Sequence, residues 1–155
     1  MSDAEIAKNV AVNGDIYLFR GTSPGWAGNP GAQATAVSAA TDPYSATVFA
    51  LQARGQSGQG VLQFGTRSEI GTFIEGQWMA SQEREVGLEM SSIDFAQRAP
   101  NSVSVDTARQ ALNDMGMPEL PYSILNSSQR SQFLDMAPRM TPEQIADFLS
   151  RVKLK

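Results

Sequence analysis

The stretch DIYLFRGT, residues 15–22, carries a β-strand signal from which the rest of the fold can be placed. β-Branched and aromatic residues dominate Asp15 to Phe19, a composition typical of strands. We expect the strand to end at Arg20-Gly21, before a loop rich in Pro and Gly. An arginine is not needed to form this strand. It is either an ordinary solvated strand end or a bidentate ligand for phosphate or carboxylate groups.

The segment that follows the loop is expected to turn from a short strand into a helix. Residues 34–40 (ATAVSAA) could form the strand, and Asp42-Pro43 is typical of a helix start, with an N-cap and a proline at the first helical position. The hydroxyls of Ser38 and Thr41 either cap this helix or orient another side chain. The spacing i, i+3, i+4, i+7 predicts one apolar helix face, formed by Ala46, Phe49, Ala50 and Ala53.

Further short segments predict a β-rich core. We expect a strand over residues 61–66 (VLQFGT), an apolar run over residues 70–74, a loop over residues 75–82, and strands over residues 83–90 and 101–105. The core therefore extends over about residues 12–105.

Helical spacing dominates the last third of the chain. Thr141-Pro142 is typical of a helix start, with Gln144 at the third helical position, and another helix is expected to begin near Ser127 or Ser128. A third helix, ending before Gly116, is indicated by Ala108, Ala111, Leu112 and Met115. The sequence thus predicts one α+β domain over residues 1–155, with a helical C-terminal portion over about residues 106–155.

Two carboxylates stand close together near the end of the predicted core. Glu83 and Glu85 are two residues apart, so in a strand they face the same side. Like charges that close raise one pKa unless a cation or hydrogen bonds compensate. The pair is either a solvated strand end or a pair of catalytic carboxylates. Trp78, in the expected loop before them, is either a packing residue or an exposed contact.

Composition excludes several function classes. The 155 residues include 12 Lys+Arg and 16 Asp+Glu, a net charge of −4, which excludes a generally cationic nucleic-acid or membrane-surface binder. There is no Cys and no His, so thiol nucleophiles, Ser-His-Asp hydrolases and zinc hydrolases with His ligands are excluded. No apolar stretch reaches the ~20 residues of a membrane span, and the acidic residues near Met1 argue against a secretory leader.

Taken in order, these motifs resemble the mono-ADP-ribosyltransferases of the Arg-Ser-Glu branch, which cholera-like toxins and vertebrate arginine-modifying enzymes share. The resemblance rests on YLFRGT (17–22), SAATDPYSATVFA (38–50) and EREV (83–86). It extends from about Tyr17 to Val86, less than half of the chain. It implies a split, mixed β-core of ADP-ribosyltransferase type with flanking helices and a C-terminal helical tail. NAD would lie between the two strand halves, where Arg20, Ser38 and Glu85 would converge.

The resemblance also implies a cofactor-binding role for several residues. Arg20 would bind the phosphate side of NAD, and Gly21, with Thr22 beside it, would offer its backbone to the nicotinamide amide. Phe64 or Phe73 would stack on the nicotinamide. NAD acts here as a substrate, and no metal is required.

The catalytic roles fall on a serine and the two glutamates. Ser38 matches the first residue of a Ser-Thr-Ser motif that helps to hold the catalytic glutamate, although Ala39 and Ala40 replace the other two residues. Glu85 matches that glutamate and would stabilise the oxocarbenium-like ribose as nicotinamide leaves. Glu83 would orient an incoming guanidinium and take its proton.

The resulting hypothesis is a bacterial toxin or effector that transfers ADP-ribose from NAD to a target protein, on arginine, with Trp78 and Glu83 recognising that acceptor. The alternatives are an NAD glycohydrolase toxin and a catalytically inactive interaction domain of the same fold. A cognate immunity or inhibitor protein is a further candidate partner, whereas nucleic acid and membrane are not expected as partners. Such an effector would be secreted or delivered and would act in the target-cell cytoplasm.

Overall fold

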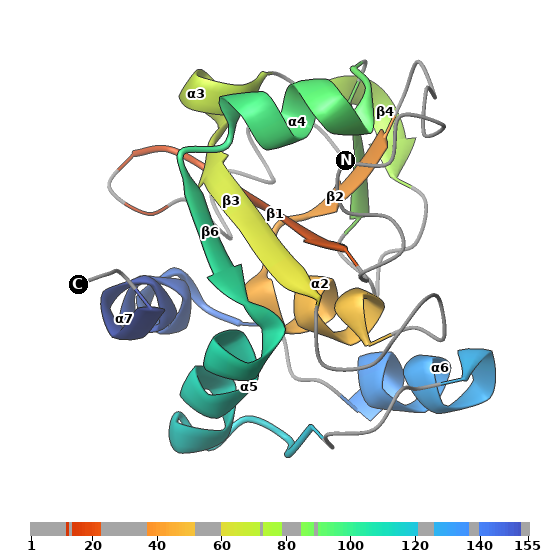
Figure 1. Ribbon diagram of the computed structural model, residues 1–155, viewed down its shortest axis with the longest axis vertical. Helices are drawn as coiled ribbons and strands as arrows, with labels where there is room; N and C mark the ends of the chain where they lie inside the picture. Colours follow the sequence, from red (N-terminus) through yellow and green to blue (C-terminus); the bar gives the residue numbers. More distant parts are fainter. Residues whose placement is uncertain are drawn as a thin grey trace.

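The computed structural model describes Val12 and residues 14–22, 37–51, 60–71, 73–78, 85–88, 90–120, 126–136 and 140–152. Within these ranges the chain alternates strands and helices along most of its length (Figure 1). The elements are β1 (Tyr17–Thr22), β2 (Val37–Ala40), α2 (Pro43–Ala50), β3 (Val61–Thr66), α3 (Arg67–Ile70), β4 (Phe73–Trp78), β5 (Glu85–Leu88), α4 (Ser92–Arg98), β6 (Asn101–Ser104), α5 (Val105–Asp114), α6 (Ser127–Met136) and α7 (Pro142–Val152).

The described strands form a six-stranded sheet in the order β4-β5-β2-β1-β3-β6. This confirms the predicted α+β class. All the pairings among the described strands are antiparallel, which differs from the mixed sheet that we expected. The reason lies in the crossover from β2 through α2 to β3. These two strands run in the same direction, but β1 lies between them, so the crossover creates no parallel pair.

Among the described strands, β1 and β2 share the fewest paired residues. β1 pairs with β3 along its whole length, from Tyr17↔Thr66 to Thr22↔Val61. Between β1 and β2 the register holds only Phe19↔Ala40 within the described residues. We call this single paired position the joint of the sheet. It separates a β1–β3–β6 half from a β4–β5–β2 half.

A large hydrophobic cluster covers one face of the sheet, and residues of α2, α5, α6 and α7 belong to it. Phe19 of β1 is at its centre, with ring centroids 5.5 Å from Phe64 and 6.0 Å from Phe148 of α7. Pairs at these separations add about 0.5–1.5 kcal/mol beyond the burial of apolar area. Figure 1 shows α5 and α7 near each other, below the strands.

A small hydrophobic cluster covers the other face, beneath α3 and α4. It consists of Ile16, Leu18, Ala39, Ile70, Leu88, Met90 and Phe95. Leu18 and Phe19 are adjacent in β1 but belong to different clusters, as the alternation of a strand requires. Both faces of the sheet are therefore covered in its central strands.

The helix α2 is almost completely buried. Asp42 caps it, since its Oδ1 accepts a hydrogen bond of 2.8 Å from the Ser45 N–H, and Pro43 occupies the first turn as predicted. Tyr44 is fully buried, and its hydroxyl donates to the Pro118 carbonyl at 3.0 Å. The polar Ser45 and Thr47 are buried as well, and their hydroxyls donate to Asp42 Oδ2 and to the Pro43 carbonyl within the helix. Because α2 is buried on nearly all sides, we take it as the central support of the β1–β3–β6 half.

Several sequence predictions are confirmed at their boundaries. The strand over 61–66 is β3, and the proposed capping pair of α7 is present, because Thr141 Oγ1 accepts from Gln144 N–H at 3.2 Å and Gln144 Oε1 accepts from Thr141 N–H at 2.9 Å. The helix expected before Gly116 is α5, and Gly116 adopts a φ of 82° just after it. Neither α3 nor α4 was predicted.

Two predictions of strand and loop boundaries are wrong. β1 continues through Arg20 and Gly21 to Thr22 because β3 pairs with all three residues. The expected loop over residues 75–82 begins instead as strand β4, which ends at Trp78. β4 is an edge strand that pairs irregularly with β5, and the polar, Gly-containing sequence around Gly76 is compatible with such a bulged edge.

Candidate functional site

The residues predicted to form an active site lie on four consecutive strands of the sheet. Trp78 is on β4, Glu85 on β5, Ser38 on β2 and Arg20 on β1, and the sheet order places these strands side by side. The four residues extend over 66 positions of sequence, from Arg20 to Glu85. The fold therefore brings together the strands that carry the motifs, which sequence spacing alone could not establish.

The registers define how close the backbone positions are. Glu85 is opposite Ala40, and Ala40 is opposite Phe19, which directly precedes Arg20. Ser38 is opposite Gly87, two residues along from Glu85. Neighbouring strands are about 4.8 Å apart, so the backbone of Glu85 lies about 10 Å from that of Phe19.

Arg20 lies beside the point where the two halves of the sheet separate. It pairs with Gln63 of β3 on one side, while on the other side the registered pairing with β2 ends at Phe19↔Ala40 in the described part of the chain. Its side chain is half-buried, and burial lowers the pKa of its guanidinium below the ordinary value. Arginine nevertheless stays protonated at neutral pH, so Arg20 supplies a fixed positive charge.

Gly21 has a packing role that the sequence did not reveal. A Cβ at this position would lie 1.9 Å from the carbonyl oxygen of Ala46 in α2 and 2.9 Å from the Ala50 Cβ. Only glycine fits such a close approach of a strand to a helix backbone. The predicted contact between the Gly21 backbone and nicotinamide stays a prediction, but the need for glycine here has a sufficient structural cause.

The structure corrects the assignment of two other cofactor-binding residues. Phe64 is 2% exposed and stacks on Phe19 inside the large cluster, so its ring is not accessible to nicotinamide. Thr22 is buried too, and its hydroxyl is directed toward the Val61 carbonyl at 3.5 Å. Each residue follows or precedes a glycine in its strand, and the strand pattern alone does not show which face is buried.

The acidic motif falls largely on residues whose side chains the structure does not describe. Glu83 lies outside the described residues, and only the backbones of Ser38, Phe73, Trp78 and Glu85 are described. Trp78 is opposite Val86, which directly follows Glu85. The predicted acceptor-recognition tryptophan and the predicted catalytic glutamate therefore stand at neighbouring backbone positions.

Strand alternation bears on the convergence of Arg20 and Glu85. Phe19 points into the large cluster, so Arg20 points to the opposite face of β1. Ala40, the register partner of Glu85, belongs to the same cluster as Phe19. Arg20 therefore lies on the face of β1 opposite to Phe19 and Ala40, and Ala40 is the backbone register partner of Glu85.

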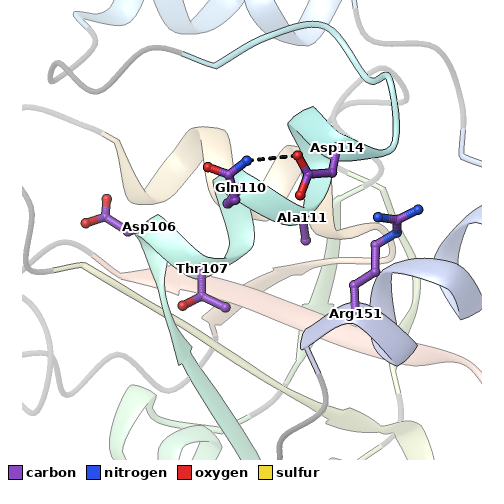
Figure 2. A pocket seen from close by; sticks show the side chains of 6 residues that line it. All are labelled: Asp106, Thr107, Gln110, Ala111, Asp114 and Arg151. Carbon is purple, nitrogen blue, oxygen red and sulfur yellow. Dashed lines mark hydrogen bonds between the residues drawn. The ribbon is translucent and has the colours of Figure 1, made fainter.

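A hollow between α5 and α7 lies outside these motifs and was not predicted. It has a volume of about 530 Å³, and Figure 2 shows Arg151 of α7 on the side opposite the polar residues of α5. Its polar side chains recur at i, i+4 and i+8 along α5, at Asp106, Gln110 and Asp114. This spacing is visible in the sequence and could have indicated a continuous polar stripe on one helix face.

Comparisons with known proteins add no relative to this site. No protein-family model, curated protein or solved structure matches the chain. Among the described helices, none is long and apolar enough to cross a membrane.

Proposed function

We propose that this protein is an NAD-dependent mono-ADP-ribosyltransferase whose site lies where the two halves of the sheet separate. The observation that supports the proposal is the sheet order β5-β2-β1, which sets the motif residues Glu85, Ser38 and Arg20 on three adjacent strands. The narrow joint between β1 and β2 is compatible with the split β-core that the motif resemblance implies.

The chemistry needs no histidine. The bond between the ribose C1 atom and the nicotinamide nitrogen breaks, nicotinamide leaves with the bonding electron pair, and a nucleophile of the acceptor protein forms the new bond to C1 and releases a proton. Glu85 stabilises the positive charge that develops on the ribose. Glu83 takes the proton from an arginine acceptor. Arg20 compensates the pyrophosphate charge, which a chain of net charge −4 would otherwise repel.

A catalytically inactive interaction domain is the second candidate function. Strand alternation favours it, because Arg20 points away from the face that carries Phe19 and Ala40. A carboxylate on that face would not act on the substrate molecule that Arg20 holds.

Nicotinamide release from NAD tests the proposal. The purified protein is incubated with NAD, with and without a cell lysate as a source of acceptors. Release that requires the lysate, together with transfer of labelled ADP-ribose to protein, supports a transferase. Release without lysate indicates a glycohydrolase instead, and no release under either condition indicates an inactive domain.

A further inference from the structure

The hollow between α5 and α7 is an open groove with room for a short peptide segment. Its volume of about 530 Å³ lies within the range of about 300–1,000 Å³ that is typical of ligand sites. The lining combines charged, polar and small side chains from the two helices: Asp106, Thr107, Gln110, Ala111, Asp114 and Arg151.

The balance of charge in the hollow is negative. Arg151 Nε donates to Asp147 Oδ1 of its own helix at 2.9 Å, so a carboxylate already compensates the single cation of the lining. Asp114 accepts a hydrogen bond of 2.8 Å from the neutral Gln110 amide. Asp106 forms an ion pair with the buried Arg109, while its own side chain is 59% exposed. A cationic ligand fits this field, and a phosphate or an acidic segment does not.

The two carboxylates of the lining stand at opposite ends of the hollow. Asp106 and Asp114 are eight residues apart on α5, which corresponds to about 12 Å along the helix axis. Thr107 and Gln110 lie between them, and a hydroxyl and an amide can both donate and accept hydrogen bonds to a peptide backbone. An extended segment with two cationic side chains four residues apart covers about 13 Å and so matches this spacing.

One end of the hollow is connected to the end of β1. Val105, which directly precedes Asp106, donates its N–H to the Gly60 carbonyl at 3.0 Å. Gly60 in turn packs against the end of β1, because a Cβ there would lie 2.8 Å from the Thr22 carbonyl oxygen. The Asp106 end is therefore connected by direct contacts to the strand that carries Arg20.

We infer that the hollow between α5 and α7 docks a basic segment of the acceptor protein through two cationic side chains. The inference rests on the proposed function for the identity of its partner, since an acceptor held there would approach the end of β1. The docking itself depends only on the groups of α5 and α7.

Peptide binding without NAD tests this docking. The probe is a fluorescein-labelled seven-residue Gly/Ser peptide with arginines at positions 2 and 6, and the control peptide carries citrulline at both positions. Fluorescence anisotropy should show at least about tenfold tighter binding of the arginine peptide at low salt, with a loss of affinity as added salt screens the charges. Equal affinity of the two peptides would overturn the inference.

Two substitutions of Asp114 and one control substitution outside the hollow test whether the arginine peptide binds in the hollow. Asp114→Asn should weaken the arginine peptide about threefold, and Asp114→Lys should weaken it further. Asp135→Asn, which removes an exposed carboxylate from α6 outside the hollow, should leave the affinity unchanged. Asp106 is a poorer choice for substitution, because its loss would leave the buried Arg109 without this ion pair. If the variants at Asp114 and at Asp135 behave alike, the binding is not in the hollow.

Arg151→Gln tests whether the hollow prefers a ligand of positive or negative charge. The substitution removes a cation from the rim and releases Asp147 from its ion pair, so a basic peptide should bind more tightly. Weaker binding would show that Arg151 attracts the ligand and would overturn the inference. Docking without NAD cleavage would refute the transferase while leaving the basic-segment site intact. NAD cleavage without docking would refute only the docking.

Discussion

The two halves of the sheet differ in how firmly the fold supports them. In the β1–β3–β6 half, β1 and β3 pair over six residues, and Phe19 packs between Phe64 and Phe148. In the β4–β5–β2 half, β2 and β5 pair over four residues, and the register between β4 and β5 shifts. The well-supported half carries Arg20, whereas the predicted catalytic glutamate is on the other half.

The contrast suggests a division of roles in the proposed enzyme: one half of the sheet holds the fold, and the other carries the carboxylates that react. A fixed cation belongs on a rigid strand, because pre-organised charges stabilise a transition state without reorganising. Carboxylates that must meet an incoming acceptor can lie near an edge of the sheet, where the backbone is less constrained by neighbours. The contrast predicts that substitutions in the β4–β5–β2 half change activity more than stability, and that those in the β1–β3–β6 half, apart from Arg20, do the reverse.

The largest expected effect is that of Glu85→Gln. The substitution removes the charge that stabilises the ribose cation and keeps the shape of the side chain, so NAD cleavage should fall by at least about a hundredfold. Thermal unfolding should stay close to that of the wild type. Nicotinamide release and unfolding are measured on the same preparation. Near-full activity with unchanged unfolding would remove Glu85 from the mechanism and with it the catalytic role of this half.

Glu83→Gln should separate transfer from hydrolysis. An arginine acceptor is protonated in water and needs both orientation and proton removal, whereas water needs less help. Labelling of the acceptor should therefore fall about a hundredfold, while slow NAD hydrolysis largely persists. Both activities are compared in parallel. A parallel fall in the two would mean that Glu83 acts on NAD itself, and intact transfer would mean that the acceptor is not arginine.

Gly21→Ala tests the other half. A methyl group 1.9 Å from the Ala46 carbonyl oxygen must push α2 away from β1, at a cost near the upper end of the ~1–3 kcal/mol typical of overpacking. Chemical denaturation measures the loss of unfolding free energy. Gly116→Ala is the matched control: nothing lies within 4 Å of its added Cβ, and only its φ of 82° costs free energy, about 1 kcal/mol. If both variants lose the same amount, α2 does not rest tightly on β1.

Local sequence signals were sufficient to predict the helices that begin with an N-cap residue followed by proline. Asp42-Pro43 and Thr141-Pro142 mark helix starts that the structure reproduces, because caps act within one turn and need no tertiary information. The helices α3 and α4 were missed, although Thr66 and Ser91 cap them. Each is only a turn or two long, which leaves too few residues for an apolar period to emerge.

Long-range features could not be read from the sequence. The resemblance implies a cofactor role for Phe64 and Thr22, and the strand pattern around them does not show that the large cluster and the Val61 carbonyl would cover these side chains. The close approach of Ala46 to Gly21 depends on how a helix settles on a strand. The sheet order that sets Arg20, Ser38 and Glu85 on adjacent strands is likewise a property of the whole fold.

The smallest expected effect is that of Tyr44→Phe, which sharpens the view that α2 anchors the β1–β3–β6 half. The loss of the hydrogen bond to the Pro118 carbonyl should cost about 1 kcal/mol of unfolding free energy, with NAD cleavage unchanged.

Burial, with a contribution from the charge of Asp42, raises the pKa of Tyr44 to about 12 from an ordinary value of 10.0. Above pH 10.0 the unfolded chain loses this proton while the folded chain keeps it, so wild-type stability should fall as the pH rises toward 12. Denaturation curves measured across this window should show a shallower fall for Tyr44→Phe, because the variant has no proton to lose at this position. Equal slopes for the two proteins would mean that the Tyr44 hydroxyl is accessible to water, and α2 would then hold the residues around Pro118 by apolar packing alone.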